Sequence, residues 1–446
     1  MREAFIFIAT TLLCLQTVFA QDTIELRGTV SDRQTGEPLV GVSIYTTSGN
    51  RFTASNLDGN YVFKVGKGDS IVFRCMGYRC DTMAATYLRK LHKMELTSQT
   101  VHLNEVEVTN FRDGYRLLMA SVARIPQNYH CDTTIGTFFH RDCRTLNGEV
   151  YVFDEMVFDM LRVGYDKYHT IRRFSPDSDG RMIGSNYKAI RYDRLLVLDT
   201  AYVDSISHGV GGVAEYNDQS VMPDDLETPY MEDYVSHPKD FVYSVMQRTA
   251  ADGHTQYILD IRSKVKKQNV GAGIKAKTTA TIRMTIEYGT LAITQIEYTG
   301  SEVIDRFPLL LRPVMRNYGL DSLSTQRHSV ARYDEVDGRH TLTSYTTHDR
   351  ITISCRQGGK MGVERQEYDM VEQGVLTFQR RGDASFLLGG GILGTKTIGL
   401  GDRTVGEVIY DDAFWRRYNY VPMDAAMRKM LKRRLGEVLQ SSVNDQ

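Results

Sequence analysis

Short runs of alternating apolar and polar residues dominate residues 22–110. Tyr61, Phe63 and Val65 alternate with Val62 and Lys64, which is the two-residue period of a half-buried β-strand. Similar runs predict strands at Ile24–Val30, Val40–Thr46, Arg51–Ala54, Gly59–Val65, Ser70–Arg74, Lys93–Thr97 and Glu105–Thr109. Turn-forming residues separate several of these runs. Short strands at this density predict a two-sheet β-sandwich over residues 22–110.

The pattern changes after residue 110 and predicts one larger α+β domain over residues 111–446. A helix is predicted at Gly114–Ile125, where Pro126 follows as a stop. Strand-like runs follow at Ile135–His140, Val150–Met160, Leu195–Ala201, Phe241–Arg248, Tyr257–Arg262, Thr278–Tyr288, Leu291–Tyr298, His340–Thr346, Arg350–Ser354, Val375–Arg380 and Gly406–Tyr410. Turns at Asp252-Gly253, Tyr288-Gly289 and Asp337-Gly338 predict hairpins. The fold class is therefore mainly β, with an antiparallel sheet in the second domain.

Two further helices are predicted, at Leu226–Ser236 and at Met423–Leu439. The second has Leu431 and Leu435 on one side and basic residues, such as Arg433, on the other. A basic amphipathic helix can lie on an anionic membrane surface. We favour the alternative, in which the helix packs across the sheet and its basic face meets water.

The first twenty residues have the features of a signal peptide. An apolar run from Phe5 to Leu15 precedes Val18-Phe19-Ala20, which fits a signal-peptidase cut before Gln21. Cys14 raises the alternative of a lipid anchor, but the bulky residues Leu12 and Leu13 precede it. We therefore expect an exported chain, located in the periplasm or associated with the outer membrane.

Charge and length exclude some classes of protein. The chain has 54 basic and 55 acidic residues, a formal net charge of −1, so it lacks the basic footprint of a nucleic-acid-binding protein. No segment reaches the roughly 20 apolar residues that a membrane-spanning helix needs. The residues after 110 are also too few for a large outer-membrane barrel with its plug. We therefore expect that this chain is not a transmembrane protein.

Four motifs in order carry a resemblance to a known family. They are Gly28-Thr29-Val30, Gly36-x-Pro38-Leu39-x-Gly41-Val42, Asp58-Gly59-x-Tyr61 and Gly77-Tyr78. This order resembles the carboxypeptidase-regulatory-like domain. The resemblance implies a seven-stranded transthyretin/immunoglobulin-like β-sandwich, and it implies an accessory role rather than catalysis. In exported proteins of the Bacteroidota this domain often precedes another envelope module.

The cysteines leave two alternatives open. Close spacing in an oxidising compartment suggests the bridges Cys75–Cys80 and Cys131–Cys143, with Cys355 left over. The other alternative is that the cysteines are buried free thiols in β-structure. Neither arrangement resembles a zinc site.

Local patterns that can carry chemistry are weak in this chain. His102 and Glu105 have the spacing of a zinc pair, but a strand would place them on opposite faces. Gly389–Gly394 matches a nucleotide-binding glycine pattern without its strand and helix. His140 and Asp142 share one face of a strand, as acid–base work would require, but a structural hydrogen bond is the commoner role. Acidic residues at Asp218, Asp224, Asp225, Glu227, Glu232 and Asp233 do not fit a calcium loop.

The sequence therefore predicts no catalytic, cofactor-binding or metal-ligating residue. We expect a non-catalytic cell-envelope protein that binds or docks a protein, lipid or glycan partner. The 26 tyrosines suit protein interfaces and sugar stacking. One alternative is an envelope hydrolase, a peptidase or glycosidase whose site is dispersed in sequence. The other is a lipid-handling module with an apolar cavity.

Overall fold

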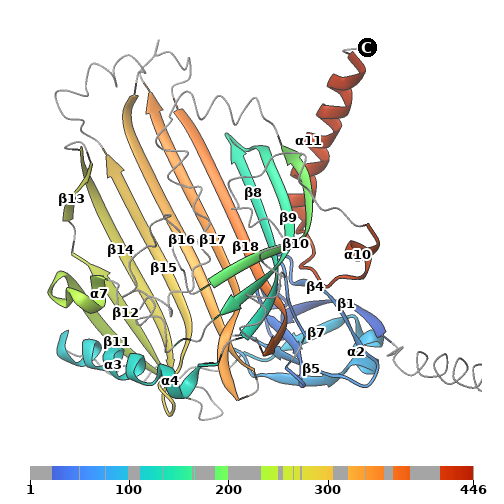
Figure 1. The fold of residues 1–446 in the computed structure, drawn as a ribbon, viewed down its shortest axis with the longest axis horizontal. Coiled ribbons are helices and arrows are strands. Elements are labelled where there is room, and N and C mark those ends of the chain that lie inside the picture. The colour runs from blue at the N-terminus through green and yellow to red at the C-terminus, as the bar shows by residue number, and fades with distance from the viewer. Residues whose placement is uncertain are drawn as a thin grey trace, which may run out of the picture.

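The protein is mainly β, as the sequence predicts, in the computed structural model (Figure 1). The structure describes residues 23–49, 51–75, 77–98, 111–132, 134–162, 165, 186–198, 233–249, 255–264, 266–271, 274–304, 320–336, 338–355, 365–381 and 412–444. Several predicted features lie outside these residues: the leader, the strands Glu105–Thr109 and Gly406–Tyr410, the turn Asp252-Gly253, His102, Glu105, Gly389–Gly394 and all of the acidic residues of 218–232.

The first unit is a β-sandwich of seven described strands. They are β1 (Thr23–Asp32), β2 (Ser43–Thr46), β3 (Phe52–Ala54), β4 (Asn60–Gly66), β5 (Ser70–Arg74), β6 (Asp81–Ala84) and β7 (Lys93–Leu96). One sheet has the order β4-β1-β7 and the other β3-β2-β5-β6. Strand β7 pairs with β1 in parallel, and the other pairs are antiparallel. Tyr61, Phe63 and Val65 enter the core between the sheets, as their alternation predicts.

Two elements of the sandwich are missing from the sequence prediction. They are the edge strand β6 and the helix α2 (Ala85–Leu91), which connects β6 to β7. The side chains of β6 are all at least partly exposed, so the strand lacks the apolar alternation that marks its neighbours. Helix α2 is short and buries only Ala85 and Leu88.

The second unit is one large antiparallel sheet of eleven strands. Its members are β8 (Thr134–Leu146), β9 (Glu149–Arg162), β10 (Asn186–Leu198), β11 (Phe241–Thr249), β12 (Thr255–Ser263), β13 (Lys266–Gly271), β14 (Ile274–Glu287), β15 (Ile293–Ile304), β16 (Leu320–Val336), β17 (Arg339–Cys355) and β18 (Arg365–Arg381). The order is β10-β9-β8-β18-β17-β16-β15-β14-β12-β11, and β13 pairs with β14. The chain therefore runs from β8 to one edge, restarts at the other edge and returns until β18 pairs with β8.

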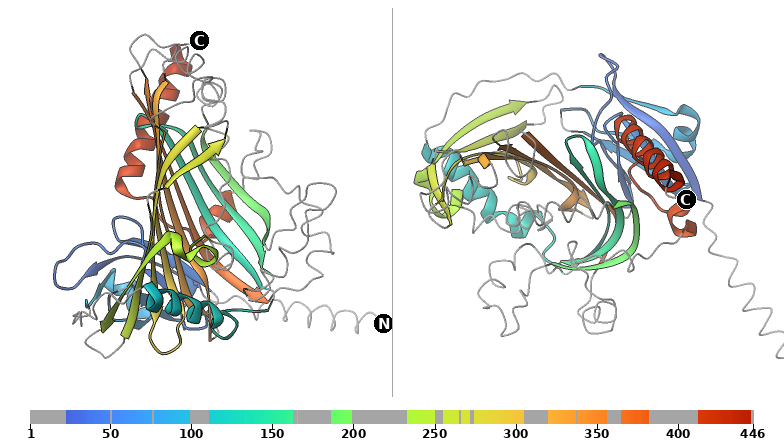
Figure 2. Two further views of the ribbon diagram at one scale, coloured as in Figure 1. Left: turned by 90° about the vertical axis from the view of Figure 1, so that its left-hand side faces the viewer. Right: turned by 90° about the horizontal axis from the view of Figure 1, so that it is seen from above.

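The sheet is strongly curved, and its two faces are covered by different parts of the chain (Figure 2). We call the concave side, packed against α3 (Phe111–Ala123) and α4 (Ile125–Asn128), the inner face. The outer face is the convex side, which packs against the sandwich, α10 (Asp412–Arg417) and α11 (Ala425–Asn444). Two short helices, α7 (Asp233–Ser236) and η2 (Pro238–Asp240), precede β11.

The predicted helices are present with shifted ends. Helix α3 covers most of the predicted Gly114–Ile125 and buries Leu118 and Val122. Helix α11 packs Leu431 against Cys143, Val150 and Phe153 of the outer face, as the packed alternative predicts. The helix predicted at Leu226–Ser236 is described only over α7. Within the described residues, no helix combines the length and the apolar character that crossing a bilayer requires.

The strands of the large sheet extend beyond their apolar segments. The sequence predicts two strands at His340–Thr346 and Arg350–Ser354, but β17 is continuous, and β16 was not predicted at all. These strands continue through polar residues because opposite charges stand in register on neighbouring strands. Arg327 Nε and Nη2 of β16 lie 2.7 and 2.6 Å from the carboxylate oxygens of Asp349 of β17. Cross-strand ion pairs thus continue the ladder where apolar alternation ends.

Candidate functional site

A cleft of about 390 Å³ lies between the sandwich and the outer face of the large sheet. Its sandwich side is lined by Gly41, Ser43, Tyr45, Arg74, Cys75, Gly77, Tyr78, Arg79 and Cys80, and its sheet side by Arg248, Gln256, Thr294, Gln295, Arg332, Tyr333 and Asp334. The volume falls in the range of ligand sites, which is roughly 300–1,000 Å³. Four arginines and a single carboxylate, Asp334, line this cleft.

Arg74 of β5 anchors the sandwich to the sheet. Its guanidinium Nη2 lies 3.3 Å from Glu287 Oε1, and its Nε lies 3.6 Å from Asp334 Oδ1. Burial lowers the pKa of Arg74, but the charges of Asp334, Tyr45 and Glu287 outweigh it and raise the pKa above its ordinary value. The charge of Arg74 is therefore balanced within the interface.

Asp334 is buried and is held by both units of the molecule. The Ser43 hydroxyl of the sandwich donates to Asp334 Oδ2 at 2.7 Å, and the Thr343 hydroxyl of β17 donates to the same oxygen at 2.6 Å. Together with Arg74, these donors satisfy the only lining carboxylate. Asp334 is thus part of the structure of the interface.

Arg248 and Arg332 differ from Arg74 because no carboxylate pairs with them among the described residues. Both side chains are half-buried, and both come from strands of the large sheet. Arg79, on the sandwich side, is exposed and is likewise not ion-paired within the described part of the chain. Three guanidinium groups in this cleft therefore have no ion-pair partner among the residues that the structure describes.

Two glycines of the sandwich motifs make room for these arginines. A Cβ at Gly41 would lie 2.6 Å from Arg332 Nη1, and a Cβ at Gly77 would lie 2.9 Å from Arg248 Nη2. Both glycines have positive φ, 65° and 82°, which favours glycine on backbone grounds as well. The same residues that mark the family motif thus form the surface on which the guanidinium groups lie.

Three further lining groups, Tyr45, Tyr78 and Cys80, stay protonated near neutral pH. Burial, reinforced by the charge of Asp334, raises the pKa of Tyr45 to about 12. Burial and a hydrogen bond to Asp32 raise the pKa of Tyr78 to about 12. Burial raises the pKa of Cys80 as well. Cys75, Cys80, Cys131 and Cys143 form no disulfide, and of these four only Cys143 is buried in a strand, so the second cysteine alternative is met at Cys143 alone.

The predicted pair His140 and Asp142 lies on the inner face, away from the cleft. Both side chains are buried, but their contacts are with other residues. His140 Nδ1 lies 2.7 Å from the Tyr345 hydroxyl, and Asp142 Oδ2 accepts a hydrogen bond of 2.9 Å from Arg144. Gly374 lies in register between His140 and Tyr345, and its missing side chain lets the Tyr345 ring cross β18.

Asp142 belongs to a row of buried acidic residues that the sequence prediction missed. It pairs in register with Asp154 of β9 on one side and with Glu372 of β18 on the other. Burial raises the pKa of Tyr345 well above its ordinary value, and the charges of Glu372 and Asp142 add to this. In the described part of the chain, no three or more His, Cys, Asp or Glu side chains are arranged to hold a metal ion.

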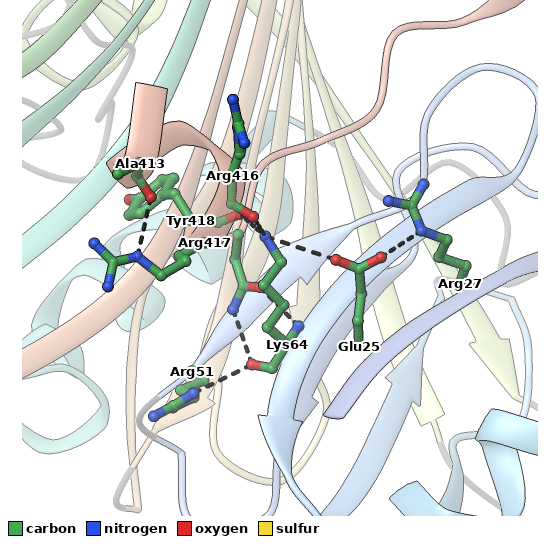
Figure 3. A network of polar contacts seen from close by, with 9 residues as sticks. Glu25, Arg27, Arg51, Lys64, Ala413, Arg416, Arg417 and Tyr418 are labelled. Atoms are coloured by element: carbon green, nitrogen blue, oxygen red, sulfur yellow. Dashed lines mark hydrogen bonds and ion pairs between the residues drawn. The ribbon is translucent and has the colours of Figure 1, made fainter. Parts of the chain in front are cut away.

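The C-terminal segment is tied to the sandwich through Lys64. Lys64 of β4 donates through Nζ to the carbonyl oxygens of Arg416 and Tyr418 (Figure 3). Its backbone N–H donates to Asn419 Oδ1 at 2.7 Å. Burial lowers the pKa of Lys64, which is the ordinary effect of desolvating a cation.

A motif residue of the sandwich also holds the start of α11. Asp58 Oδ2 accepts a hydrogen bond of 2.8 Å from the backbone N–H of Ala425, the first residue of the helix. Asp58 therefore satisfies one of the N–H groups that a helix leaves without an internal partner.

Comparison with known proteins agrees with the sandwich that the geometry defines. Residues 26–108 match the family model of the CarboxypepD_reg-like domain, so this part of the chain is similar to that family. The match supports the resemblance carried by the glycine and tyrosine motifs, and the large sheet lies outside it. No curated protein and no solved structure gives a significant match.

The arginine cleft was missed by the sequence prediction because its residues come from separate patterns. Arg248 is the last residue of the predicted strand Phe241–Arg248, and Arg332 lies in the unpredicted strand β16. Gly41 and Gly77 are the only local signal, because they stand in the family motifs.

Proposed function

We propose that this protein is a non-catalytic, exported cell-envelope protein that binds a protein, lipid or glycan partner at the cleft between its two units. The signal-peptide pattern supports export, and the match to a regulatory-like domain supports an accessory role. The observation that carries the proposal is the cleft itself, in which three guanidinium groups have no ion-pair partner within the described part of the chain.

The chemistry of the lining favours binding over proton transfer. Arginine keeps its proton at physiological pH, and a general base needs a pKa near the working pH. Two of the lining tyrosines, Tyr45 and Tyr78, have pKa values raised to about 12 and also keep their protons. These groups can hold a ligand and donate hydrogen bonds to it. The polar lining also differs from the apolar cavity that the lipid-handling alternative requires.

Export is tested by fractionating cells that produce the full chain. We expect a mature protein that begins at Gln21 in the periplasmic or outer-membrane fraction, identified by the mass of its N-terminal peptide. A lipidated chain that begins at Cys14 would replace the soluble form by the anchored alternative. A cytoplasmic protein that keeps residues 1–20 would contradict the proposal.

Partner binding is tested by photo-crosslinking in intact cells. A photo-reactive amino acid replaces Arg79, which is exposed at the cleft, and in a matched variant it replaces Arg89, which is exposed on α2. We expect a discrete adduct, resolved by mass, from position 79 and none from position 89. Equal adducts from both positions, or none from position 79, would contradict the binding of a macromolecular partner at the cleft.

A second candidate function, hydrolysis, is favoured by the acidic row on the inner face. Asp142, Asp154 and Glu372 are only 6, 4 and 3% exposed and come from three neighbouring strands, so this site is dispersed in sequence. Paired carboxylates are the groups that glycosidases use. The test compares the wild-type protein with Glu372→Gln on peptidoglycan, glycans and peptides. Products formed by the wild type alone would establish hydrolysis.

A further inference from the structure

We propose that the cleft between the sandwich and the sheet is an oxyanion site, which binds a phosphate or carboxylate group through Arg248 and Arg332. This inference rests on the proposed binding function and names the ligand chemistry. The partner group is carried by a hydroxyl-rich body, such as a sugar or a glycerol. Such a group can come from a soluble sugar phosphate or from a lipid headgroup.

The charge balance of the cleft is the first argument. Its lining contains Arg74, Arg79, Arg248 and Arg332 but only one carboxylate, Asp334, and that carboxylate is engaged by Arg74. Glu287, just outside the lining, also faces Arg74. A half-buried guanidinium group without a counter-charge is costly unless an anion accompanies it. The cleft therefore attracts an anion to the remaining arginines.

The placement of the guanidinium groups is the second argument. Arg332 lies against the backbone at Gly41, and Arg248 lies against the backbone at Gly77, within distances that any side chain at either glycine would block. Both arginines extend from strands of an eleven-stranded sheet, which is a rigid support. Planar guanidinium groups held in this way are suited to bidentate contacts with phosphate or carboxylate.

The size and lining of the cleft identify the rest of the ligand. A volume of about 390 Å³ exceeds what a bare phosphate fills, so the anionic group carries a larger body. Ser43, Gln256, Thr294 and Gln295 supply hydroxyl and amide groups around the arginines, and these match the hydroxyls of a sugar or glycerol. Tyr45 and Tyr78 add aromatic surface, which packs well on sugar rings.

The site also spans both units of the molecule. Arg248 and Arg332 belong to the sheet, whereas Tyr45, Tyr78 and Arg79 belong to the sandwich. An anion bound between them adds contacts across the interface and stabilises the docked arrangement, by an amount that grows with the logarithm of the ligand concentration above Kd.

The test is binding of defined probes to the full chain, measured by calorimetry and by thermal melting. The probes are inorganic phosphate, acetate, glucose 1-phosphate and uncharged glucose, and vesicles of phosphatidylglycerol against vesicles of phosphatidylcholine. The variant Arg248→Gln/Arg332→Gln removes both groups. The control, Arg89→Gln/Lys90→Gln on α2, makes the same charge change at exposed positions outside the cleft.

We expect the wild type and the control to bind a charged probe, with weaker binding at high salt. We expect the double variant to lose affinity by roughly tenfold or more for each arginine removed. Binding of glucose 1-phosphate alone identifies a soluble ligand, and binding of phosphatidylglycerol vesicles alone identifies a lipid headgroup. Arg79→Glu at the exposed mouth provides a second variant, expected to weaken binding without disturbing the core.

The proposal is overturned if no charged probe binds, or if the wild type and the double variant bind equally. That failure is distinguishable from failure of the proposed function. A crosslink from position 79 without oxyanion binding would leave a partner-binding protein of different ligand chemistry. Oxyanion binding without a crosslink would leave a small-molecule site and remove the macromolecular partner.

Discussion

The sandwich and the large sheet bury their apolar side chains in different ways. Every buried member of the sandwich core lies between Ile24 and Leu96, because each of its two sheets covers the other. In the described part of the chain no second sheet covers the large sheet. The core that contains residues of α3 and α4 also includes Phe52 of the sandwich, and the outer-face core includes Ala54 and Trp415. The sandwich is therefore self-sufficient, and the sheet depends on the sandwich.

This difference also explains why only the sandwich is recognisable in the sequence. Its tight turns need glycine at fixed places, such as Gly41, so its sequence carries a motif. The large sheet is built of long hairpins, and many residue types suit its polar positions. The dependence of the large sheet on the sandwich therefore produces no local sequence motif.

The strongest test of the comparison is to separate the two units. We expect residues 22–98 to fold alone with a cooperative thermal transition, and we expect residues 111–446 alone to expose apolar surface. Dye binding to exposed apolar surface and light scattering measure this, and co-production of both pieces provides the control. A second piece that melts at the temperature of the full chain would disprove the dependence.

A single sandwich residue should weaken the sheet by a large amount. Phe52 is 2% exposed and belongs to the same core as α3, α4 and the large sheet, so Phe52→Ala should lower the free energy of unfolding by about 3–5 kcal/mol. Hydrogen exchange should show the loss of protection in the large sheet. Phe73→Ala is the matched control, because Phe73 belongs to the core of the sandwich. Loss of protection confined to the sandwich in both variants would contradict the shared core.

Acid should destabilise the sheet before the sandwich. Burial lowers the pKa of His340 below its ordinary value of 6.5, so the folded state binds fewer protons than the unfolded state. Its contribution is complete above pH 6.5 and is lost as the pH falls toward the lowered value, by up to ~1.4 kcal/mol per pH unit. Urea unfolding between neutral pH and pH 5 should show a shallower decline in His340→Phe. Identical declines would exclude this histidine.

The smallest expected effect is at the contact between the sandwich and the C-terminal helix. Asp58→Ala removes the acceptor for the Ala425 N–H and should cost about 1 kcal/mol, with faster exchange in the first turn of α11. Leu57→Ala, at an exposed neighbouring position, is the control. Unchanged exchange at the start of α11 would mean that Asp424, which accepts from Met427, caps the helix alone.

Sequence patterns predicted the elements that bury an apolar stripe and missed those that do not. The strand Ser70–Arg74 has the predicted bounds, because Ile71 and Phe73 fill the sandwich core. Strand β16 was missed because its N-terminal half is mostly polar and includes residues that form cross-strand ion pairs, such as Arg327 with Asp349. Such ion pairs can be recognised only when the register of the two strands is known.

The candidate site shows the same limit. Arg248 and Arg332 are ordinary strand arginines in the sequence, and only the sheet order and the docking of the sandwich bring them to one cleft. The acidic row is likewise a product of register, since Asp154, Asp142 and Glu372 stand on three different strands.

The bonds between Lys64 and Asn419 set an order of events during biosynthesis. They join residues 355 positions apart, so the sandwich leaves the ribosome long before the segment that it holds. The self-contained core allows the sandwich to fold early, whereas the outer face of the curved sheet can be covered only after the segment around Asn419 has been synthesised. Chains that stop early would therefore keep an uncovered outer face, which quality-control proteases can recognise.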